Sequence, residues 1–552
     1  MPEVAAENTS VEDTEKSEQE EFNDTLDDAT ILHIIEGWEQ ESQEFYGNLE
    51  RIWEENLLYY KGIQTDVQKI RGKHSKSVEN RIFMAVETEI PLVTGRLPDA
   101  VVKPAQEDEQ SIIDALDLED ILEYQFERVH IQELAERWIR DMIIKRYSVF
   151  KVVWDEKIDD VGVQVIDPRR IRIPKYGKTV DELAYVIEEL ELSYGQIEDF
   201  FGKEKAEKIK SQKVDSNTKV RKKTYLVKEV WTNDFVVWKA GSEILKKESN
   251  PYFKKNGFFD APKKPYVIKS LFETEECIIG DTDYIQQVKS IQDNINIRKR
   301  QIEDIVGKVS NPYLLIDSDV MSEEKAANIT NEPGAILYGR EAASGTKIRF
   351  ESPGQVSNAL FEDLQLSRNE FDNIWGIHST TRGERQGKET LGGRQILREA
   401  DLGRVDLVGR TLERALDEIA EYWTQLISLF YTEERSFAIL GGDGVRFVRN
   451  FTGSRVGKMM KPMVKSGSTL KEDDFSIKQT GIMLWQSGAI GLKTLYKMLK
   501  FSNMQEAIDD FVQTKSGAIL QGGQQPAVPF TSDSIPQEQA QSGPQEPPGT
   551  IL

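Results

Sequence analysis

The sequence contains very little cysteine and histidine, and it has no long apolar run. Its single cysteine, Cys277, excludes an internal disulfide bond and fits a reducing compartment. No stretch of about 18 consecutive apolar residues is present, so the sequence predicts no membrane-spanning helix. The N-terminus has neither a basic start nor an apolar core, so we do not expect a signal peptide there.

Residues that could carry chemistry are scattered. The four histidines lack the spacing of a zinc site: His33, His74, His130 and His378. Residues 383–390 (GERQGKET) superficially resemble a phosphate-binding loop, but three residues instead of four precede Gly-Lys, and Glu389 follows Lys388. The sequence therefore predicts no metal, no cofactor and no enzymatic activity.

Positive charge is in deficit, since 71 Lys and Arg oppose 95 Asp and Glu, for a net charge of −24. Proteins that grip nucleic acid are normally basic on the gripping face, so this balance argues against a DNA clamp or a repressor. Residues 1–30 hold eleven Asp or Glu and one Lys, a net −10, and predict a disordered acidic arm. Residues 516–552 contain no Lys or Arg and predict a disordered Gln/Pro-rich tail.

Residues 31–280 combine helical and strand patterns. Apolar spacing predicts helices in four places: about 30–60, 77–95, 108–147 (two helices) and near 193–210. From 147 to about 275, β-branched and aromatic runs bounded by turn residues predict strands, with Asn233-Asp234 as a tight hairpin turn. The pattern is typical of an α+β fold.

The block that follows is the most informative one. Six apolar residues between 281 and 308, which we call the seam residues, recur at helical spacing: Tyr284, Val288, Ile291, Ile295, Ile302 and Ile305. Most of the residues between them are polar. One narrow apolar seam on a largely solvated helix indicates packing along a line against neighbouring copies, as in a ring or bundle.

The second half of the chain alternates between inserts and helices. We expect a strand-and-turn insert over 309–355, a returning helix over 356–375 and a glycine-rich loop over 376–392. A long helix over 393–432, strands over 433–488 and weak helices over 489–515 would follow. The long helix would measure about 60 Å and kink near Gly403 and Gly409. The run DFSIKQTG, residues 474–481, is expected among the strands.

Three phrases carry a family resemblance: NRIFMAVETEIPLVTGRLPDAVVKP (80–104), VIDPRRIRIP (165–174) and KETLGGRQILREAD (388–401). Together with the order of helices, insert and loop, they resemble the portal proteins of tailed bacteriophages. The resemblance covers roughly residues 30–515, and the order of the parts carries more weight than any single phrase.

The resemblance implies an α+β portal fold, with an α/β wing, a two-helix stem, a small α/β clip, a long kinked wing helix and a helical crown. The stem would comprise residues 281–308 and 356–375, the clip 309–355, and the crown helices 489–515. Twelve copies would form a ring at one capsid vertex, with a channel through which DNA is packaged and ejected.

Residues 376–392 would project into this channel as a tunnel loop. The residues expected to meet passing phosphates there are Arg382, Arg385, Gln386 and Lys388. Because Glu384 and Glu389 offset the three cations, we expect weak, salt-sensitive contacts without sequence specificity.

The resemblance also implies partners: further copies of the chain, the terminase large subunit, a head–tail adaptor, the major capsid or scaffolding protein, and double-stranded DNA. The protein would reside in the virion, after assembly in the host cytoplasm, and would not contact a membrane.

Two alternative functions are another structural virion protein, such as a minor head protein or head–tail adaptor, and a packaging ATPase or nuclease. The last would need an intact phosphate-binding loop or clustered metal-binding carboxylates.

Overall fold

The computed structural model describes most of the chain between residues 27 and 499. The described residues are 27–64, 74–96, 98–211, 224–252, 263–273, 277–310, 313–316, 324, 348–351, 357–377, 391–440, 446–457, 460–465, 474–491, 494–495 and 498–499. They form two compact units, one comprising residues 1–439 with 448–472 and the other residues 440–447 with 473–552. The predicted tail, 516–552, lies outside the described residues.

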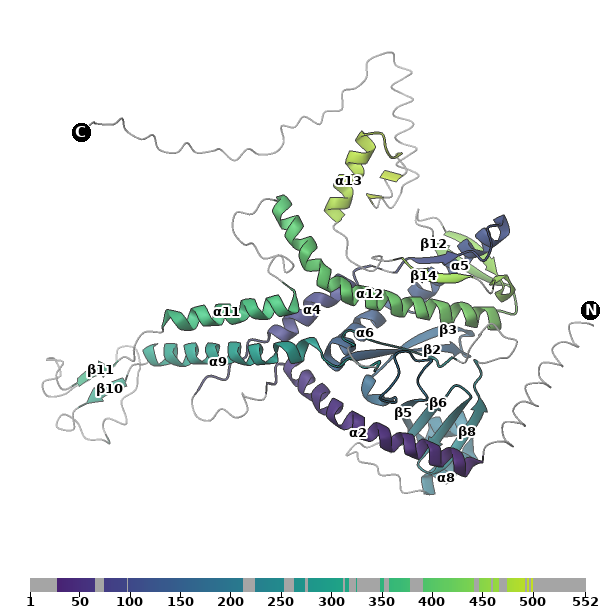
Figure 1. The fold of residues 1–552 in the computed structure, drawn as a ribbon, viewed down its shortest axis with the longest axis horizontal. Coiled ribbons are helices and arrows are strands. Elements are labelled where there is room, and N and C mark those ends of the chain that lie inside the picture. The colour runs from purple at the N-terminus through teal and green to yellow at the C-terminus, as the bar shows by residue number, and fades with distance from the viewer. Residues whose placement is uncertain are drawn as a thin grey trace, which may run out of the picture. The chain divides into compact units, whose positions relative to one another are not determined.

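The N-terminal half begins with the predicted helices, which the structure confirms (Figure 1). They are α2 (Asp28–Tyr60), α4 (Arg81–Val93), α5 (Glu109–Arg128) and α6 (Ile131–Lys145). The side chain of Asn80 accepts a hydrogen bond from the N–H of Phe83 (3.1 Å) and so caps α4. Since α2 begins at Asp28, the last residues of the predicted acidic arm are helical, and residues 1–26 of that arm lie outside the described residues.

Two antiparallel sheets follow, with the strand orders β3-β2-β9 and β4-β5-β6-β7-β8. Their bounds are β2 (Tyr147–Asp155), β3 (Asp160–Ile166), β4 (Ile171–Arg172), β5 (Val186–Ser193), β6 (Thr224–Trp231), β7 (Phe235–Ala240), β8 (Glu243–Ser249) and β9 (Tyr266–Ser270). The short helices α7 (Tyr194–Phe201) and α8 (Lys203–Ser211) interrupt the second sheet, close to the predicted place. Asn233 and Asp234 connect the β6–β7 hairpin, as predicted. β8 was not predicted, because its sequence EILKKES is rich in charge.

The three-stranded sheet is covered on both faces. On one face Trp138 of α6 stacks on Phe150 of β2, with ring centroids 5.1 Å apart. Helix α12 (Leu391–Phe430) packs on the same face, where Phe430 stacks on Trp154 of β2, and the indole N–H of Trp423 donates to the carbonyl oxygen of Gly162 in β3 (3.1 Å). This helix confirms the long helix predicted over 393–432 and is bent along its course (Figure 1). On the opposite face, Tyr147 and Val149 of β2 share a core with Tyr46, Leu49 and Trp53 of α2.

The inward face of α12 fills the core of this unit. Its buried apolar residues recur at helical spacing: Val405, Val408, Leu412, Leu416, Ile419, Trp423 and Ile427. Phe430, expected on the same face, is partly exposed and stacks on Trp154 at 4.6 Å. At the end of α12, the N–H of Gly453 donates to the carbonyl oxygen of Tyr431 (2.8 Å), and a side chain at Gly453 would collide with the carbonyl oxygens of Ile427 and Ser428.

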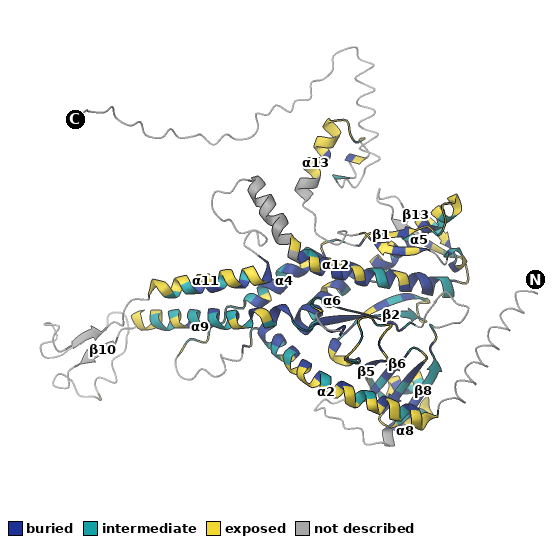
Figure 2. Cartoon of the chain, in the orientation of Figure 1, coloured by how far each residue is buried: buried dark blue, intermediate teal, exposed yellow. Residues whose placement is uncertain are grey.

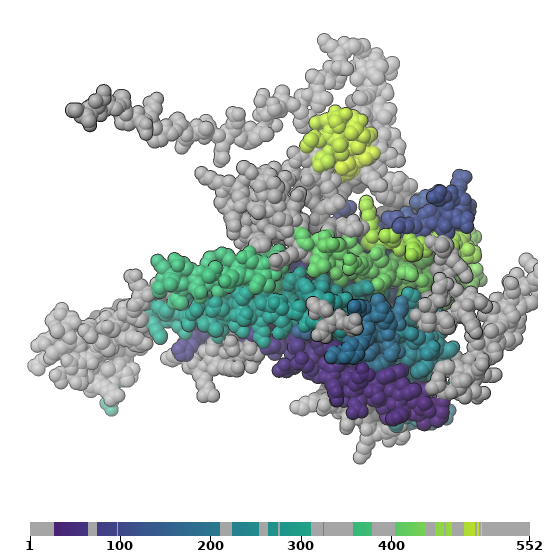
Figure 3. All heavy atoms as spheres, in the orientation of Figure 1, coloured from purple at the N-terminus to yellow at the C-terminus, as the bar shows by residue number. Residues whose placement is uncertain are grey.

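Two helices run beside each other away from the sheets: α9 (Tyr284–Ser310) and α11 (Asn358–Trp375). They confirm the two helices predicted over 281–308 and 356–375. Between them in sequence, β10 (Tyr313–Ile316) pairs antiparallel with β11 (Ile348–Glu351). Figures 1 and 3 show α9 and α11 side by side, and Figure 2 shows that exposed positions are frequent along both.

The remaining strands are β1 (Ala100–Lys103), which pairs with β14 (Lys461–Val464), and β12 (Arg435–Leu440), which pairs with β13 (Arg446–Phe451). The strand expected over 474–481 is wrong, because these residues belong to helix α13 (Asp474–Gln486). Only Phe475 and Ile477 alternate there, and the apolar residues 482–485 that follow Gly481 contain no proline, so a helix can continue through them. Most of the predicted helices at 489–515 lie outside the described residues.

None of the helices in the described ranges is long and apolar enough to cross a bilayer.

Candidate functional site: the α9–α11 helix pair

The pair α9–α11 is held together by polar contacts along its length. Asn294 Nδ2 donates to Ser367 Oγ at 2.8 Å, and one turn farther out Arg298 Nε donates to Asp363 Oδ2 at 2.5 Å. The residue numbers rise on α9 as they fall on α11, so the helices are antiparallel. With 27 residues, α9 is about 40 Å long.

The seam residues lie on the side of α9 that meets its own chain. Tyr284, Val288 and Ile295 are fully buried, whereas Ile291, Ile302 and Ile305 are half-buried. We expected neighbouring copies to cover this seam. The structure differs for the three buried residues, since the same chain already covers them and leaves no surface there for a second copy.

An aromatic cluster closes the inner end of the pair. The ring of Trp375 at the end of α11 stacks on Tyr284 (5.1 Å between centroids) and on Phe371 (5.8 Å). Its indole N–H donates to Glu89 Oε2 of α4 at 3.0 Å. Burial raises the pKa of Glu89 to about 7, and the hydrogen bond from Trp375 lowers it less than burial raises it.

A second contact, which the sequence did not suggest, runs along the polar side of α9. Residues 74–81, which we call the brace, pair with α9 through main-chain groups. The N–H groups of Glu79 and Arg81 donate to Asn296 Oδ1 (2.9 Å) and Gln292 Oε1 (3.1 Å). Both amide side chains are fully buried, although the polar residues of this helix were expected to be solvated.

The brace also ties α9 to α11 through charge. The carboxylate of Glu79 accepts two hydrogen bonds from Arg368 of α11, at 2.9 and 2.6 Å, and Lys299 of α9 lies 3.8 Å away. Arg81 Nη2 donates to Asp372 of α11 at 2.5 Å. Burial acts to raise the pKa of Glu79, but Arg368, Lys299 and Arg81 outweigh it and hold the pKa below its ordinary value.

The sequence of α9 carries a signal for the brace. Gln292, Asn296 and Arg300 recur every four residues on one side of α9, and all three are buried. A polar stripe at helical spacing indicates that this side meets polar main-chain groups rather than water. The seam residues lie on a different side of the helix.

Apolar side chains remain exposed on the outward sides of the pair. On α11, Phe361 is 48% exposed and Leu366 is 57% exposed, and on α9 Ile297 is 40% exposed. Phe361 and Leu366 are five residues apart and so about 140° apart around the helix. The pair therefore presents apolar groups on two different sides, which we call the Phe361 flank and the Leu366 flank.

The residues predicted to contact DNA are not part of this geometry. Arg382, Arg385, Gln386 and Lys388 lie outside the described residues, as does most of the predicted clip, 309–355.

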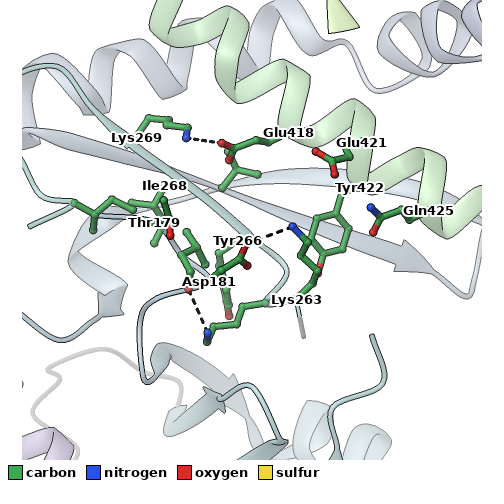
Figure 4. A pocket seen from close by; sticks show the side chains of 14 residues that line it. Thr179, Asp181, Lys263, Tyr266, Ile268, Lys269, Glu418, Glu421, Tyr422 and Gln425 are labelled. Atoms are coloured by element: carbon green, nitrogen blue, oxygen red, sulfur yellow. Dashed lines mark hydrogen bonds and ion pairs between the residues drawn. The ribbon is translucent and has the colours of Figure 1, made fainter. Parts of the chain in front are cut away.

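A pocket of about 220 Å³ lies elsewhere, between β9, the turn at 179–181 and α12 (Figure 4). Two of its lysines are paired with acidic residues of the same pocket, since Lys269 contacts Glu418 at 2.5 Å and Lys263 contacts Asp181 at 3.4 Å. No cluster of His, Cys, Asp and Glu suited to a metal ion occurs in the part of the chain that the structure describes. Neither the pocket nor the helix pair carries an arrangement that points to a reaction.

The comparison with known families gives one result. The family model for phage P22-like portal proteins matches residues 126–474, well over half of the 552-residue chain. The match includes the phrases at 165–174 and 388–401, both sheets, α9, α11 and α12, but not the phrase at 80–104. No curated protein matches the chain.

Proposed function

The chain belongs to the family of phage P22-like portal proteins, a structural and non-enzymatic family, and from this premise we propose that twelve copies form a ring around a DNA channel. The ring would occupy one vertex of the capsid. DNA would pass through it during packaging and again during ejection.

The observation that carries the proposal is the pair of flanks on α9–α11. A ring needs a heterologous contact, in which one face of each copy meets a different face of the next. The Phe361 flank and the Leu366 flank, with Ile297 on α9, supply two distinct partly apolar faces on an elongated element. A dimer with two-fold symmetry would need only one such face.

Within this ring we assign α9 and α11 to the stem. The insert at 309–355 would form the clip and the docking site for the terminase large subunit and later for the head–tail adaptor. The loop at 376–392 would project into the channel with Arg382, Arg385, Gln386 and Lys388, while other copies, capsid or scaffolding protein would contact the wing.

Native mass spectrometry of the purified protein tests the assembly. The expected species has twelve times the chain mass of 63.1 kDa. A chain that stays monomeric at every salt concentration would contradict the proposal.

The role of the loop is tested separately by neutralising Arg382, Arg385 and Lys388 together. We expect assembly to be unchanged and DNA packaging or retention in particles to fall, because weak phosphate contacts are lost. If the triple variant failed to assemble, the loop would have a structural role instead.

A further inference from the structure

The strand β3 is a sheet edge, along which Val161, Val163 and Ile166 are buried, Val165 is half-buried and Gln164 is exposed. It is the outermost strand in the order β3-β2-β9, and its stretch Val161–Ile166, VGVQVI, contains neither a charge nor a proline. An exposed edge strand invites pairing with another chain, and proteins normally blunt such edges with charge, proline, a bulge or a very short strand. This stretch of β3 has none of these.

The other edges of the two sheets are protected. β8 carries Lys246, Lys247 and Glu248 in succession, and β4 has only two residues. β9 carries Lys269, and α12 and the turn at 179–181 lie beside it and line a pocket with it (Figure 4). The contrast singles out β3.

The hydrogen-bond pattern of the three-stranded sheet determines which main-chain groups of β3 point away from β2. The N–H of Val152 in β2 donates to Pro265 (2.9 Å), so Val152 faces β9 and the adjacent residues of β2 face β3. Those residues, Lys151 and Val153, lie opposite Gln164 and Gly162. The alternating residues of β3 therefore direct their N–H and C=O groups away from β2.

Three residues of β3 have this outward orientation, and one of them is already used. The carbonyl oxygen of Val161 accepts a hydrogen bond from Arg128. For Val163 and Val165, no hydrogen bond to the outward N–H or C=O is found among the described residues. A strand added at this edge would find these groups available.

A groove of about 490 Å³ accompanies this edge, with α6 as its wall. Val165 lies opposite Phe150, whose ring stacks on Trp138 of α6, so the side chains of Val163 and Val165 point to the α6 face. Leu134 and Arg137 of α6 line the groove above them. An incoming strand would therefore meet one apolar and one cationic side chain.

Charge in the groove favours an acidic partner. Arg140 is paired with Glu87 at 2.9 Å, and Lys145 with Asp141 and Asp167 at 2.7 and 2.9 Å. Arg137 is exposed, and within the described ranges it has no ion pair. A carboxylate on the added strand would form an ion pair with Arg137.

We propose that β3 accepts an extended segment of a second copy of this chain, which adds a strand at Val163 and Val165 and places a carboxylate against Arg137. The inference rests on the proposed ring, in which each copy meets two neighbours. A chain with 24 more acidic than basic side chains offers many such carboxylates. An uncharged edge suits a lasting contact between subunits, since it would cause aggregation if it stayed exposed.

Hydrogen exchange measured on rings and on dissociated subunits tests the proposal. We expect the amides of Val163 and Val165 to exchange at least about 100-fold more slowly in the ring, because a strand contact protects them. Equal exchange of both amides in the two states would overturn the proposal while leaving the ring itself intact. Absence of rings in the wild-type protein would overturn both.

Two variants separate pairing from folding. Val165→Pro removes an outward N–H, so the subunit should keep its thermal transition while ring formation falls at least about tenfold. Its matched control is Gln164→Pro, which removes an N–H that faces β2 and should destabilise the subunit itself.

The charge contact is tested by Arg137→Glu, which should reduce ring formation and leave the subunit folded. Normal rings from a folded Arg137→Glu variant would overturn the assignment of a carboxylate to Arg137.

Discussion

The two halves of α9 are stabilised in different ways. In the inner half, Tyr284, Val288 and Ile295 are buried by the same chain, and the brace covers the polar side. In the outer half, Ile302 and Ile305 are half-buried and Val306 is 47% exposed. The inner half is therefore stabilised within the subunit. The outer half and the flanks of α11 leave apolar surface that another chain can cover.

The largest expected effect is at the inner end. Trp375→Ala should lower the free energy of unfolding of the subunit by about 3–5 kcal/mol, because a buried indole leaves a cavity and Glu89 loses its hydrogen-bond donor. Urea denaturation of the dissociated subunit measures it. Phe361→Ala, on the exposed flank, is the control and should change stability by less than about 1 kcal/mol. Equal effects of the two substitutions would erase the distinction between the two regions.

The next effect depends on pH. The folded-state pKa of Glu89 is about 7, above its ordinary value of 4.5, so the unfolded chain ionises first as pH rises. Stability is therefore lost between about pH 4.5 and 7, by about 3 kcal/mol in total. The Glu89→Gln side chain cannot ionise, so the variant should not lose this stability. The difference in free energy of unfolding between the variant and wild type should therefore rise by about 3 kcal/mol in favour of the variant from about pH 4.5 to 7, as urea denaturation at several pH values would show. A constant difference at every pH would contradict the assignment.

A smaller effect is expected at the brace. Glu79→Ala should cost about 1–3 kcal/mol, because Arg368 loses two hydrogen bonds in a half-buried setting. The matched control is Glu362→Ala, which removes an exposed carboxylate from α11 and should have little effect on the melting temperature. If both variants melted alike, the brace would not stabilise the pair.

The smallest effect on the subunit, and the sharpest on assembly, is expected at the flanks. Leu366→Ser should change the free energy of unfolding of the subunit by less than about 0.5 kcal/mol, since Leu366 is mostly exposed. Ring formation, followed by native mass spectrometry against protein concentration, should nevertheless weaken. Unchanged assembly would show that this flank faces solvent in the ring.

Local patterns predicted the elements well. The spacing of Ile31, Trp38 and Leu49 gave α2, the seam residues gave α9, and the apolar face from Val405 to Ile427 gave α12, because each element is long and strongly periodic. The strand over 474–481 was wrong, and β8 was missed, because two alternating apolar residues and a charged edge strand give little signal.

The tertiary contacts were much harder to predict. The brace joins Glu79 to Arg368, which lie 289 positions apart, and no local pattern links two such residues. The open edge of β3 likewise depends on which strands pair, and strand order is set by long-range contacts. The seam was correctly identified as apolar, but whether its own chain or a neighbour covers it could not be decided from periodicity.

In the proposed ring, neighbouring copies contact one another through the outward flanks of α9 and α11. End-on class averages of the negatively stained protein test this most directly. We predict closed rings with a central opening. Single copies under every salt and concentration condition, with the flanks left in water, would contradict it.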